Sequence, residues 1–245
     1  MLNGWNRRVA LLLACLALAG CHRGEETDFE VLLRNGSSMY AQHKEEPVLR
    51  HFFRDRRDGV FLDVGCFQWQ ELSTTYYLEK HLGWSGIAVD ALADFRAGWQ
   101  RNRPRSRFFQ YVVSDRSGDE VVFYEAEGSE GVSSTSREWV VNFFRDRFPN
   151  VKPDIREQRV PTITLDDLLT REGVEKIDLL SMDIEGSEPA ALAGFDIQRF
   201  HPELVLIEAR GENQAVLMEY FDSHGYERVE AYLSHDLLNW YFRPR

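Results

Sequence analysis

Cysteine is scarce in this chain, with Cys15, Cys21 and Cys66 the only ones among 245 residues. The first two lie within or directly after an apolar segment near the start. If that segment is removed as a leader, Cys66 alone remains in the folded part, which then has no internal disulfide. No histidine or other base is obviously placed to activate Cys66, so we expect a small core or turn residue rather than a nucleophile.

Long apolar runs and an excess of positive charge are also missing. After the start of the chain no segment stays apolar for about 18 residues, so we predict no membrane-spanning helix there. Lys and Arg number 29 against 40 Asp and Glu, and the net charge of −11 argues against a nucleic-acid partner recognised through a basic surface. The sequence also has no Walker-type loop, no paired-cysteine metal site and no Ser-His-Asp grouping.

The start of the chain differs from the rest. Arg7 and Arg8 precede an apolar run over residues 9–19, and small residues lead up to Cys21. This pattern resembles the lipobox of a bacterial lipoprotein signal. The resemblance implies a signal peptide over residues 1–20, cleavage before Cys21 and lipidation of its thiol.

The lipoprotein pattern also predicts where the protein resides. It implies the bacterial cell envelope, with attachment to the membrane through a lipid on Cys21 rather than through a spanning helix. His22 in place of Asp points to the outer membrane. A polar tether over residues 21–28 then leads to a single domain over residues 29–245. The alternatives are a short uncleaved anchor or a misplaced start codon. If the signal is spurious, the protein would be cytoplasmic.

Three segments have the pattern of buried strands that end at acidic residues or glycine. They are residues 61–66 (FLDVGC), 87–90 (IAVD) and 177–186 (IDLLSMDIEG). A helix-length segment separates the first two, as at the start of a doubly wound α/β nucleotide-binding half. Residues 228–233 and 240–243 predict a closing antiparallel pair. We therefore predict one Rossmann-like α/β domain that binds an adenosine-type cofactor.

The strand ends supply candidate cofactor-binding residues. Gly65 would let the backbone approach a ligand closely, although one glycine also suits a plain turn. Asp63 could accept a hydrogen bond from an ammonium or hydroxyl group, or cap the turn. Asp90 could accept from both ribose hydroxyls. Ser114 and Asp115 follow the third strand, on the edge where an adenine amino group would lie, and a simple turn is the alternative for Asp115.

Asp183 and Glu185 follow the fourth strand, where a parallel sheet binds ligands. One carboxylate could act as general base on a substrate hydroxyl while the other fixes the turn or the cofactor. A divalent metal site is also possible, because Asp183, Glu185 and Glu208 could converge as hard oxygen ligands. The alternative is that Asp183 and Glu185 cap the helix that begins near Pro189.

Five blocks of sequence together resemble the FkbM-type methyltransferase family, with coverage from about residue 61 to residue 232. The blocks are residues 63–65, 73–75, 83–90, 160–169 and 176–188. The resemblance implies a class I methyltransferase fold with a seven-stranded, mostly parallel sheet and S-adenosylmethionine over its carboxyl edge. It also implies methyl transfer, usually to a hydroxyl oxygen of a sugar, glycan or secondary metabolite.

Carried over by position, the resemblance assigns a role to each candidate residue. Asp63 and Gly65 would line the methionine part of the cofactor, and Asp90 would hold the ribose. Ser114 and Asp115 would lie near the adenine. Asp183 would face the transfer site as the base, with Glu185 in support.

Two aromatic residues depart from the family pattern. Phe67 stands where Asn is usual, and Trp69 stands where Gly is usual. The indole could obstruct the cofactor or turn outward and leave the pocket open. A second interpretation therefore stays open beside the enzyme: a non-catalytic, membrane-anchored binding module on the same fold. The acceptor itself is not identified by the sequence, but we expect residues 128–150 to select it.

Overall fold

The protein is described by a computed structural model, which covers residues 27–211 and 213–245. The predicted signal peptide, Cys21 and most of the predicted tether lie outside these residues. The first helix, α1 (Asp28–Asn35), begins after Thr27, whose side chain caps it. No helix in the described part is long and apolar enough to cross a membrane.

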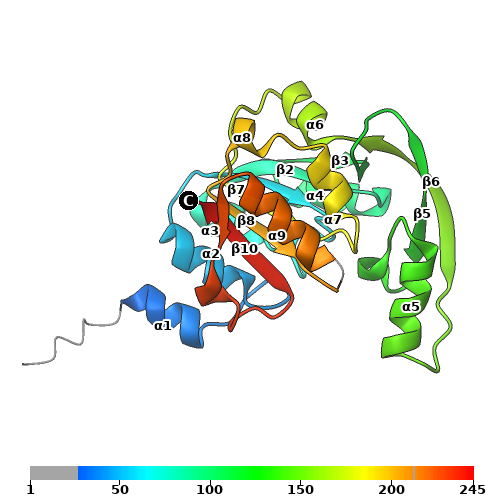
Figure 1. Cartoon of the computed structure of the whole chain (residues 1–245), viewed down its shortest axis with the longest axis horizontal. Helices are drawn as coiled ribbons and strands as arrows, with labels where there is room; N and C mark the ends of the chain where they lie inside the picture. The colour runs from blue at the N-terminus through cyan, green and yellow to red at the C-terminus, as the bar shows by residue number, and fades with distance from the viewer. Residues whose placement is uncertain (1–26, 212) are drawn as a thin grey trace, which may run out of the picture.

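Seven strands form the central sheet in the order β3-β2-β1-β7-β8-β10-β9 (Figure 1). β10 runs antiparallel to both of its neighbours, β8 and β9, and all other neighbouring strands are parallel. Their bounds are β1 (Val60–Val64), β2 (Ser85–Asp90), β3 (Ser106–Gln110), β7 (Leu179–Met182), β8 (Leu204–Glu208), β9 (Tyr226–Arg228) and β10 (Asn239–Pro244). The predicted α/β class, the seven-stranded sheet and the closing antiparallel pair are therefore confirmed.

The first strand of that closing pair lies earlier than predicted. β9 ends at Arg228, and the residues expected to form the strand continue into a short 3-10 helix, η3 (Glu230–Tyr232). The Tyr232 hydroxyl lies 2.8 Å from Nδ1 of His51, and its ring packs in the core. Tertiary contacts of this tyrosine thus outweigh the local strand pattern.

Helices cover both faces of the sheet. Successive residues of the central strands point to opposite faces, and both sets are apolar, so each face needs a covering layer. One core layer includes Leu62, Leu180 and Val205 of the strands. It is covered by α6 (Leu165–Arg171), α7 (Glu188–Ala193), α8 (Ile197–Phe200) and α9 (Asn213–Ser223). The other face carries α2 (Glu45–Phe53), α3 (Tyr76–Leu82) and α4 (Arg96–Asn102), with α1 packed on α2.

A second, three-stranded sheet stands beside the central one, at the right of Figure 1. It pairs β4 (Val112–Val113), β6 (Ile155–Ile163) and β5 (Glu120–Ala126), and β5 and β6 form an antiparallel hairpin. The linker of this hairpin contains η2 (Glu130–Val132) and α5 (Arg137–Arg147). Tyr111 separates β3 from β4, and there the chain passes from the central sheet to the second one.

Candidate functional site

A cavity of about 520 Å³ opens at the carboxyl ends of β1, β2 and β7. The turns after these strands form its floor, and the linker between β5 and β6 forms one wall. Residues from α2 and β10 complete the opposite part of the lining. Its volume falls in the range of small-molecule sites, and its place at the carboxyl edge of a parallel sheet is where such folds bind ligands.

The turn after β1 brings two strand ends together at Gly65. This residue has φ of +77°, and a Cβ on it would lie 1.8 Å from the carbonyl oxygen of Asp183. Its N–H donates to the carbonyl of Val89 at 2.9 Å. Position 65 therefore requires glycine for two reasons, its positive φ and the closeness of the backbone just after β7. Both reasons hold whatever ligand the cavity takes.

Asp63 precedes this turn and is buried in the cavity wall. Its Oδ2 accepts a hydrogen bond of 2.6 Å from the Thr75 hydroxyl. Burial raises the pKa of Asp63 to about 6, while the hydrogen bond from Thr75 and the charge of Arg103 oppose the rise. Asp63 is thus a carboxyl that ionises close to neutral pH inside the site.

A fully buried arginine holds Thr75 in place. Arg103 donates to Thr75 Oγ1 at 3.0 Å and to Glu79 Oε2 at 2.6 Å, and its guanidinium lies 4.2 Å from the ring centre of Trp99. It also donates to the Ser73 hydroxyl at 3.2 Å, just before α3 begins at Tyr76. Sequence analysis missed Arg103, because one arginine among several in a polar stretch carries no sign of burial.

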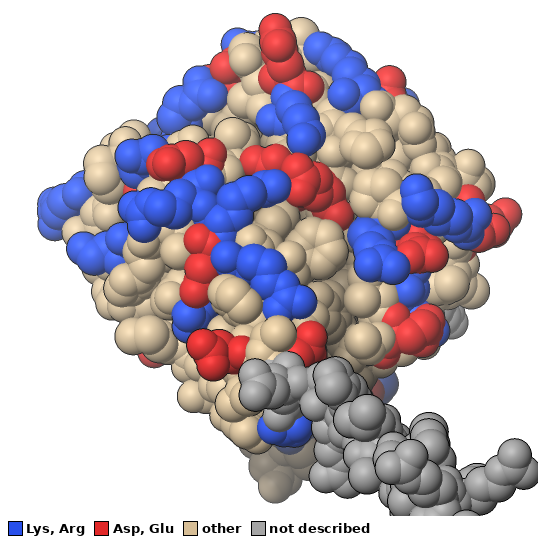
Figure 2. All heavy atoms as spheres, turned by 90° about the vertical axis from the view of Figure 1, so that its left-hand side faces the viewer, with Lys and Arg blue, Asp and Glu red and all other residues tan. Residues whose placement is uncertain are grey.

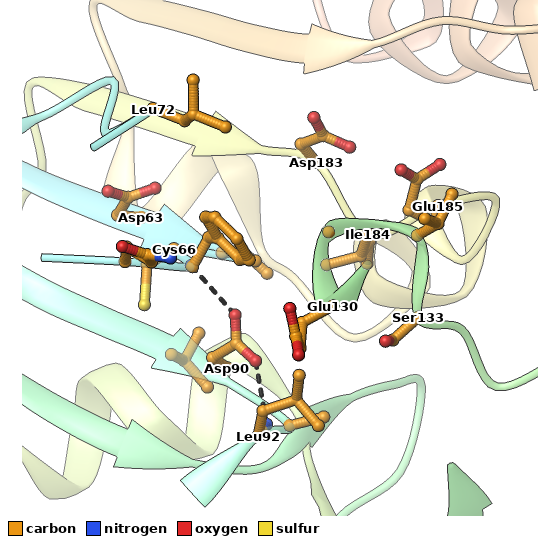
Figure 3. Close-up of a pocket in the computed structure, with 18 of the residues that line it drawn as sticks. Asp63, Cys66, Leu72, Asp90, Leu92, Glu130, Ser133, Asp183, Ile184 and Glu185 are labelled. Carbon is orange, nitrogen blue, oxygen red and sulfur yellow. Dashed lines mark hydrogen bonds between the residues drawn. The ribbon is translucent and has the colours of Figure 1, made fainter. Parts of the chain in front are cut away.

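Asp90 ends β2 and faces the cavity with both carboxylate oxygens already oriented. Oδ2 accepts from the N–H of Phe67 at 3.0 Å, and Oδ1 accepts from the N–H of Leu92 at 2.8 Å (Figure 3). Burial raises the pKa of Asp90 to about 6, and these two hydrogen bonds oppose the rise. Each oxygen has a further lone pair for a ligand hydroxyl.

Trp69 turns away from the cavity. It does not contribute to the cavity lining, and it packs with Cys66, Trp99 and the rest of a small core cluster under α4. Gly98 on α4 makes room for it, because a Cβ there would lie 2.5 Å from the indole. Phe67 does line the cavity, and its backbone N–H donates to Asp90. Trp69 therefore leaves the pocket open, while Phe67 forms part of its wall.

Asp183 and Glu185 both line the cavity beyond β7. Asp183 Oδ1 and Glu185 Oε2 are buried atoms without a hydrogen-bond partner among the described residues. Burial raises the pKa of Asp183, and it raises the pKa of Glu185 to about 9 with help from the charge of Asp183. Glu185 is therefore protonated at neutral pH, which suits a hydrogen-bond donor and leaves the role of base to Asp183.

Glu208 and Arg210 lie behind this pair. Arg210 contacts Glu208 at 2.5 Å and reaches Glu185 at 3.8 Å. Burial, followed by the charges of Asp183 and Glu185, raises the pKa of Glu208 to about 10. Arg210 lowers the pKa values of Glu185 and Glu208 but does not offset burial and the repulsion from neighbouring acids, so both carboxyls stay protonated at neutral pH.

Neither Asp183 nor Glu185 caps α7, which has no side-chain cap, and its first residue, Glu188, instead holds the turn before the helix. Its Oε1 accepts from the N–H groups of Ile184 and Gly186 at 3.1 and 3.3 Å. One carboxylate oxygen each from Asp183, Glu188 and Glu208 lie within 4.8 Å of one another. This is the group whose spacing could admit a divalent cation, with Glu188 in place of the Glu185 considered from the sequence.

Ser114 and Asp115 do not reach the cavity lining. The Ser114 N–H donates to the carbonyl of Ile163, and its hydroxyl donates to Asp115, whose side chain is 51% exposed. The residues just before them, Tyr111 to Val113, line the cavity instead. The structure therefore brings together Asp63, Gly65, Asp90, Asp183 and Glu185, and leaves Ser114 and Asp115 outside.

The linker between β5 and β6 supplies site residues that the sequence placed only within a broad segment. Glu130 and Ser133 lie at the same hollow as Asp90 (Figure 3). The Ser134 hydroxyl donates to the carbonyl of Glu185 at 3.2 Å, which fastens the linker to the turn after β7. Glu45 and Asn239 also line the cavity, and sequence analysis missed both.

Comparison with known proteins shows the family and more distant relatives. A family model described as "Methyltransferase FkbM domain" matches residues 54–228. The 2-O-methyltransferase NoeI of Sinorhizobium fredii (strain NBRC 101917 / NGR234) is 26% identical over 147 residues, which is 57% of this chain. The match spans 58% of the length of that enzyme.

Two solved structures to which this chain is similar are described as methyltransferases. A TehB-like SAM-dependent methyltransferase from Corynebacterium glutamicum is 13% identical, with a TM-score of 0.45 over 89% of this chain and 94% of its own. A precorrin-6y C5,15-methyltransferase from Geobacter metallireducens is 12% identical, with a TM-score of 0.41 over 79% of this chain and 78% of its own.

Proposed function

Because the chain belongs to the FkbM methyltransferase domain family, we propose that it transfers a methyl group from S-adenosylmethionine to a hydroxyl oxygen of a sugar, glycan or secondary metabolite. The observation that carries this proposal is the charge of the cavity. Seven acidic residues line it, and no Lys, Arg or His of the described chain does. Such a lining favours a ligand with positive charge, and the methionine half of this cofactor carries a sulfonium and an ammonium group.

The residues present fit the cofactor in three places. Asp90 presents two oriented carboxylate oxygens, which suit the two ribose hydroxyls. Asp63, beside Gly65, supplies a carboxylate for the ammonium group. Apolar surface for the adenine comes from Leu92 and Val112. We assign the adenine to this surface rather than to Ser114 and Asp115, because those two lie outside the cavity.

The bound cofactor supplies a methyl group on a positively charged sulfur. The protein must then align the acceptor hydroxyl with that methyl and remove one proton. Asp183 would accept the proton of the acceptor hydroxyl, while the bound cofactor would supply the methyl group and retain the S–C electron pair as a neutral thioether. Protonated Glu185 donates a hydrogen bond to the acceptor. Support for these roles comes from their unpartnered buried oxygens in the cavity wall.

The alternative of a non-catalytic binding module rested on Trp69, and that residue lies outside the cavity lining. Calorimetry with S-adenosylmethionine separates the two functions. We expect micromolar binding to the wild-type protein and a loss of at least about tenfold in Asp90→Ala, because a lost charge-assisted hydrogen bond is worth about 1.5–3 kcal/mol. Asp115→Ala is the matched control and should bind normally. No binding at millimolar cofactor would reject the enzyme.

A further inference from the structure

We propose that the acceptor carries a protonated amine near the hydroxyl that is methylated, and that Glu45 determines this specificity. This inference rests on the proposed methyl transfer and names the substrate class of the same site. An amino sugar or another amino alcohol has the required chemistry.

The first support is the distribution of acids around the cavity. Asp63 and Asp90 lie on the strand turns assigned to the cofactor, with Glu130 close to Asp90. Acidic residues remain at the part of the lining that the cofactor does not use. They are Glu45, Glu71, Asp183 and Glu185. With no basic residue of the described chain in the lining, a phosphate or carboxylate on the acceptor would have no cationic partner there.

The second support is the environment of Glu45. This residue is 4% exposed, and its Oε2 accepts from the N–H of His43 at 2.6 Å. Its Oε1 has only a long contact of 3.4 Å with the Asn239 amide. Buried Glu79 and Glu208 pair with arginines. Glu45 has no Lys or Arg partner in the described parts of the chain, although burial of an unpaired carboxylate is costly.

Acidic neighbours of Glu45 add to the cost of its negative charge. Asp236 is also buried, and it accepts from the Tyr241 hydroxyl at 2.8 Å and from Asn239 at 3.0 Å. Burial raises the pKa of Glu45 to about 7, and the charges of Asp236 and Asp183 add to the rise. A cation placed between Glu45 and Asp183 would relieve this repulsion and form charge-assisted hydrogen bonds.

The third support is where Glu45 comes from. It lies at the start of α2, and its neighbour Asn239 lies at the start of β10. Both positions fall outside the family-matched residues 54–228. The catalytic carboxyls come from the shared domain, whereas this part of the wall is added by the flanking segments. Such an addition is where acceptor specificity can differ from that of relatives.

The test uses the full protein with S-adenosylhomocysteine bound, and a panel of amino sugars and amino alcohols paired with their N-acetylated forms. We expect at least one amine to bind ten times or more tightly than its N-acetyl partner. Acceptors with a carboxylate or phosphate should not bind. Equal or tighter binding of the N-acetyl forms, or no amine bound at all, would overturn the proposal.

Variants then assign the preference to Glu45. Glu45→Gln should reduce the preference for the amine to about twofold or less without changing the affinity for S-adenosylhomocysteine. Glu45→Asp keeps the charge and should retain part of the preference, and Glu219→Gln, at an exposed residue of α9 outside the lining, should retain all of it. An unchanged preference in Glu45→Gln would remove Glu45 from this role. Failure of S-adenosylhomocysteine to bind the wild type would instead count against methyl transfer itself.

Discussion

At the scale of single residues, the site depends on positions where no other side chain fits. Gly65 is the clearest case, because its φ is positive and a Cβ would collide with the Asp183 carbonyl oxygen at 1.8 Å. The same close approach places Asp63 and Asp183 at one cavity wall. Stability and site geometry are therefore joined at this residue.

Replacement of Gly65 by alanine should destabilise the protein by more than about 2 kcal/mol, because strain at positive φ adds to the collision with backbone. Urea denaturation measures the change. Gly118→Ala is the matched control: its φ is +90°, but nothing lies within 4 Å of its Cβ position. The control should lose about 1 kcal/mol. Equal losses in the two variants would show that the contact with Asp183 is unimportant.

Two carboxyls of the site should make cofactor affinity dependent on pH. Burial raises the pKa values of Asp63 and Asp90 to about 6 each, from 3.8. Their ionised forms bind the cofactor, so affinity should be level above pH 7 and should fall as pH decreases through 6. Below its pKa, each carboxyl that must be ionised for binding lowers the cofactor affinity about tenfold per pH unit. Calorimetry between pH 5 and pH 8 tests this, and affinity that holds constant down to pH 5 would contradict it.

At the scale of elements, Arg103 connects α3, α4 and the turn after β1. It sits just after α4 and reaches Thr75 before α3, and through Thr75 it orients Asp63. Its other partner, Glu79 on α3, is itself buried. One guanidinium thus fixes two helices against the strand that carries the site.

Arg103→Met should cost about 3–5 kcal/mol of unfolding free energy, because it leaves Glu79 buried without its cation. It should also weaken cofactor binding, since Thr75 loses its donor. Arg107→Met is the comparison, because Arg107 pairs with Glu172 at the surface with 52% of its side chain exposed. Loss of that pair should cost about 1 kcal/mol or less. Similar stability of the two variants would mean that Arg103 does not hold the elements together.

At the scale of the whole molecule, charge is divided between surface and cavity. Figure 2 shows a face on which basic and acidic side chains are interspersed. Ion pairs of the described chain include those of Arg56 with Asp178 and Glu203. The cavity lining, in contrast, contains acids and no bases among the described residues. The acidic lining therefore acts on a ligand inside a cavity, where screening by water is weaker than at the open surface.

Membrane attachment through Cys21 remains a proposal about the part of the chain outside the described residues. In a bacterial host, labelled fatty acid should be incorporated into the wild-type protein and not into Cys21→Ala. Cys66→Ala is the control, because Cys66 is buried and burial raises the pKa of its thiol. Equal labelling of wild type and Cys21→Ala would reject the anchor.

Local sequence determined the fold class and most of the strand ends. Strands that are buried on both faces appear in the sequence as continuous apolar runs. The residues that follow or end these runs, Gly65, Asp90 and Asp183, can be identified from the sequence alone. Their convergence followed from parallel strands ending at one edge of a sheet. For these residues the sequence was sufficient, because each role depends on position along a strand.

Only the tertiary structure decided which other side chains reach the cavity. Trp69 faces outward because Gly98 on α4 leaves space for it. Ser114 and Asp115 miss the site because the chain leaves the central sheet at Tyr111. Glu45 meets Asn239 across 194 positions of sequence. Such contacts depend on packing between distant elements, and local pattern carries no information about them.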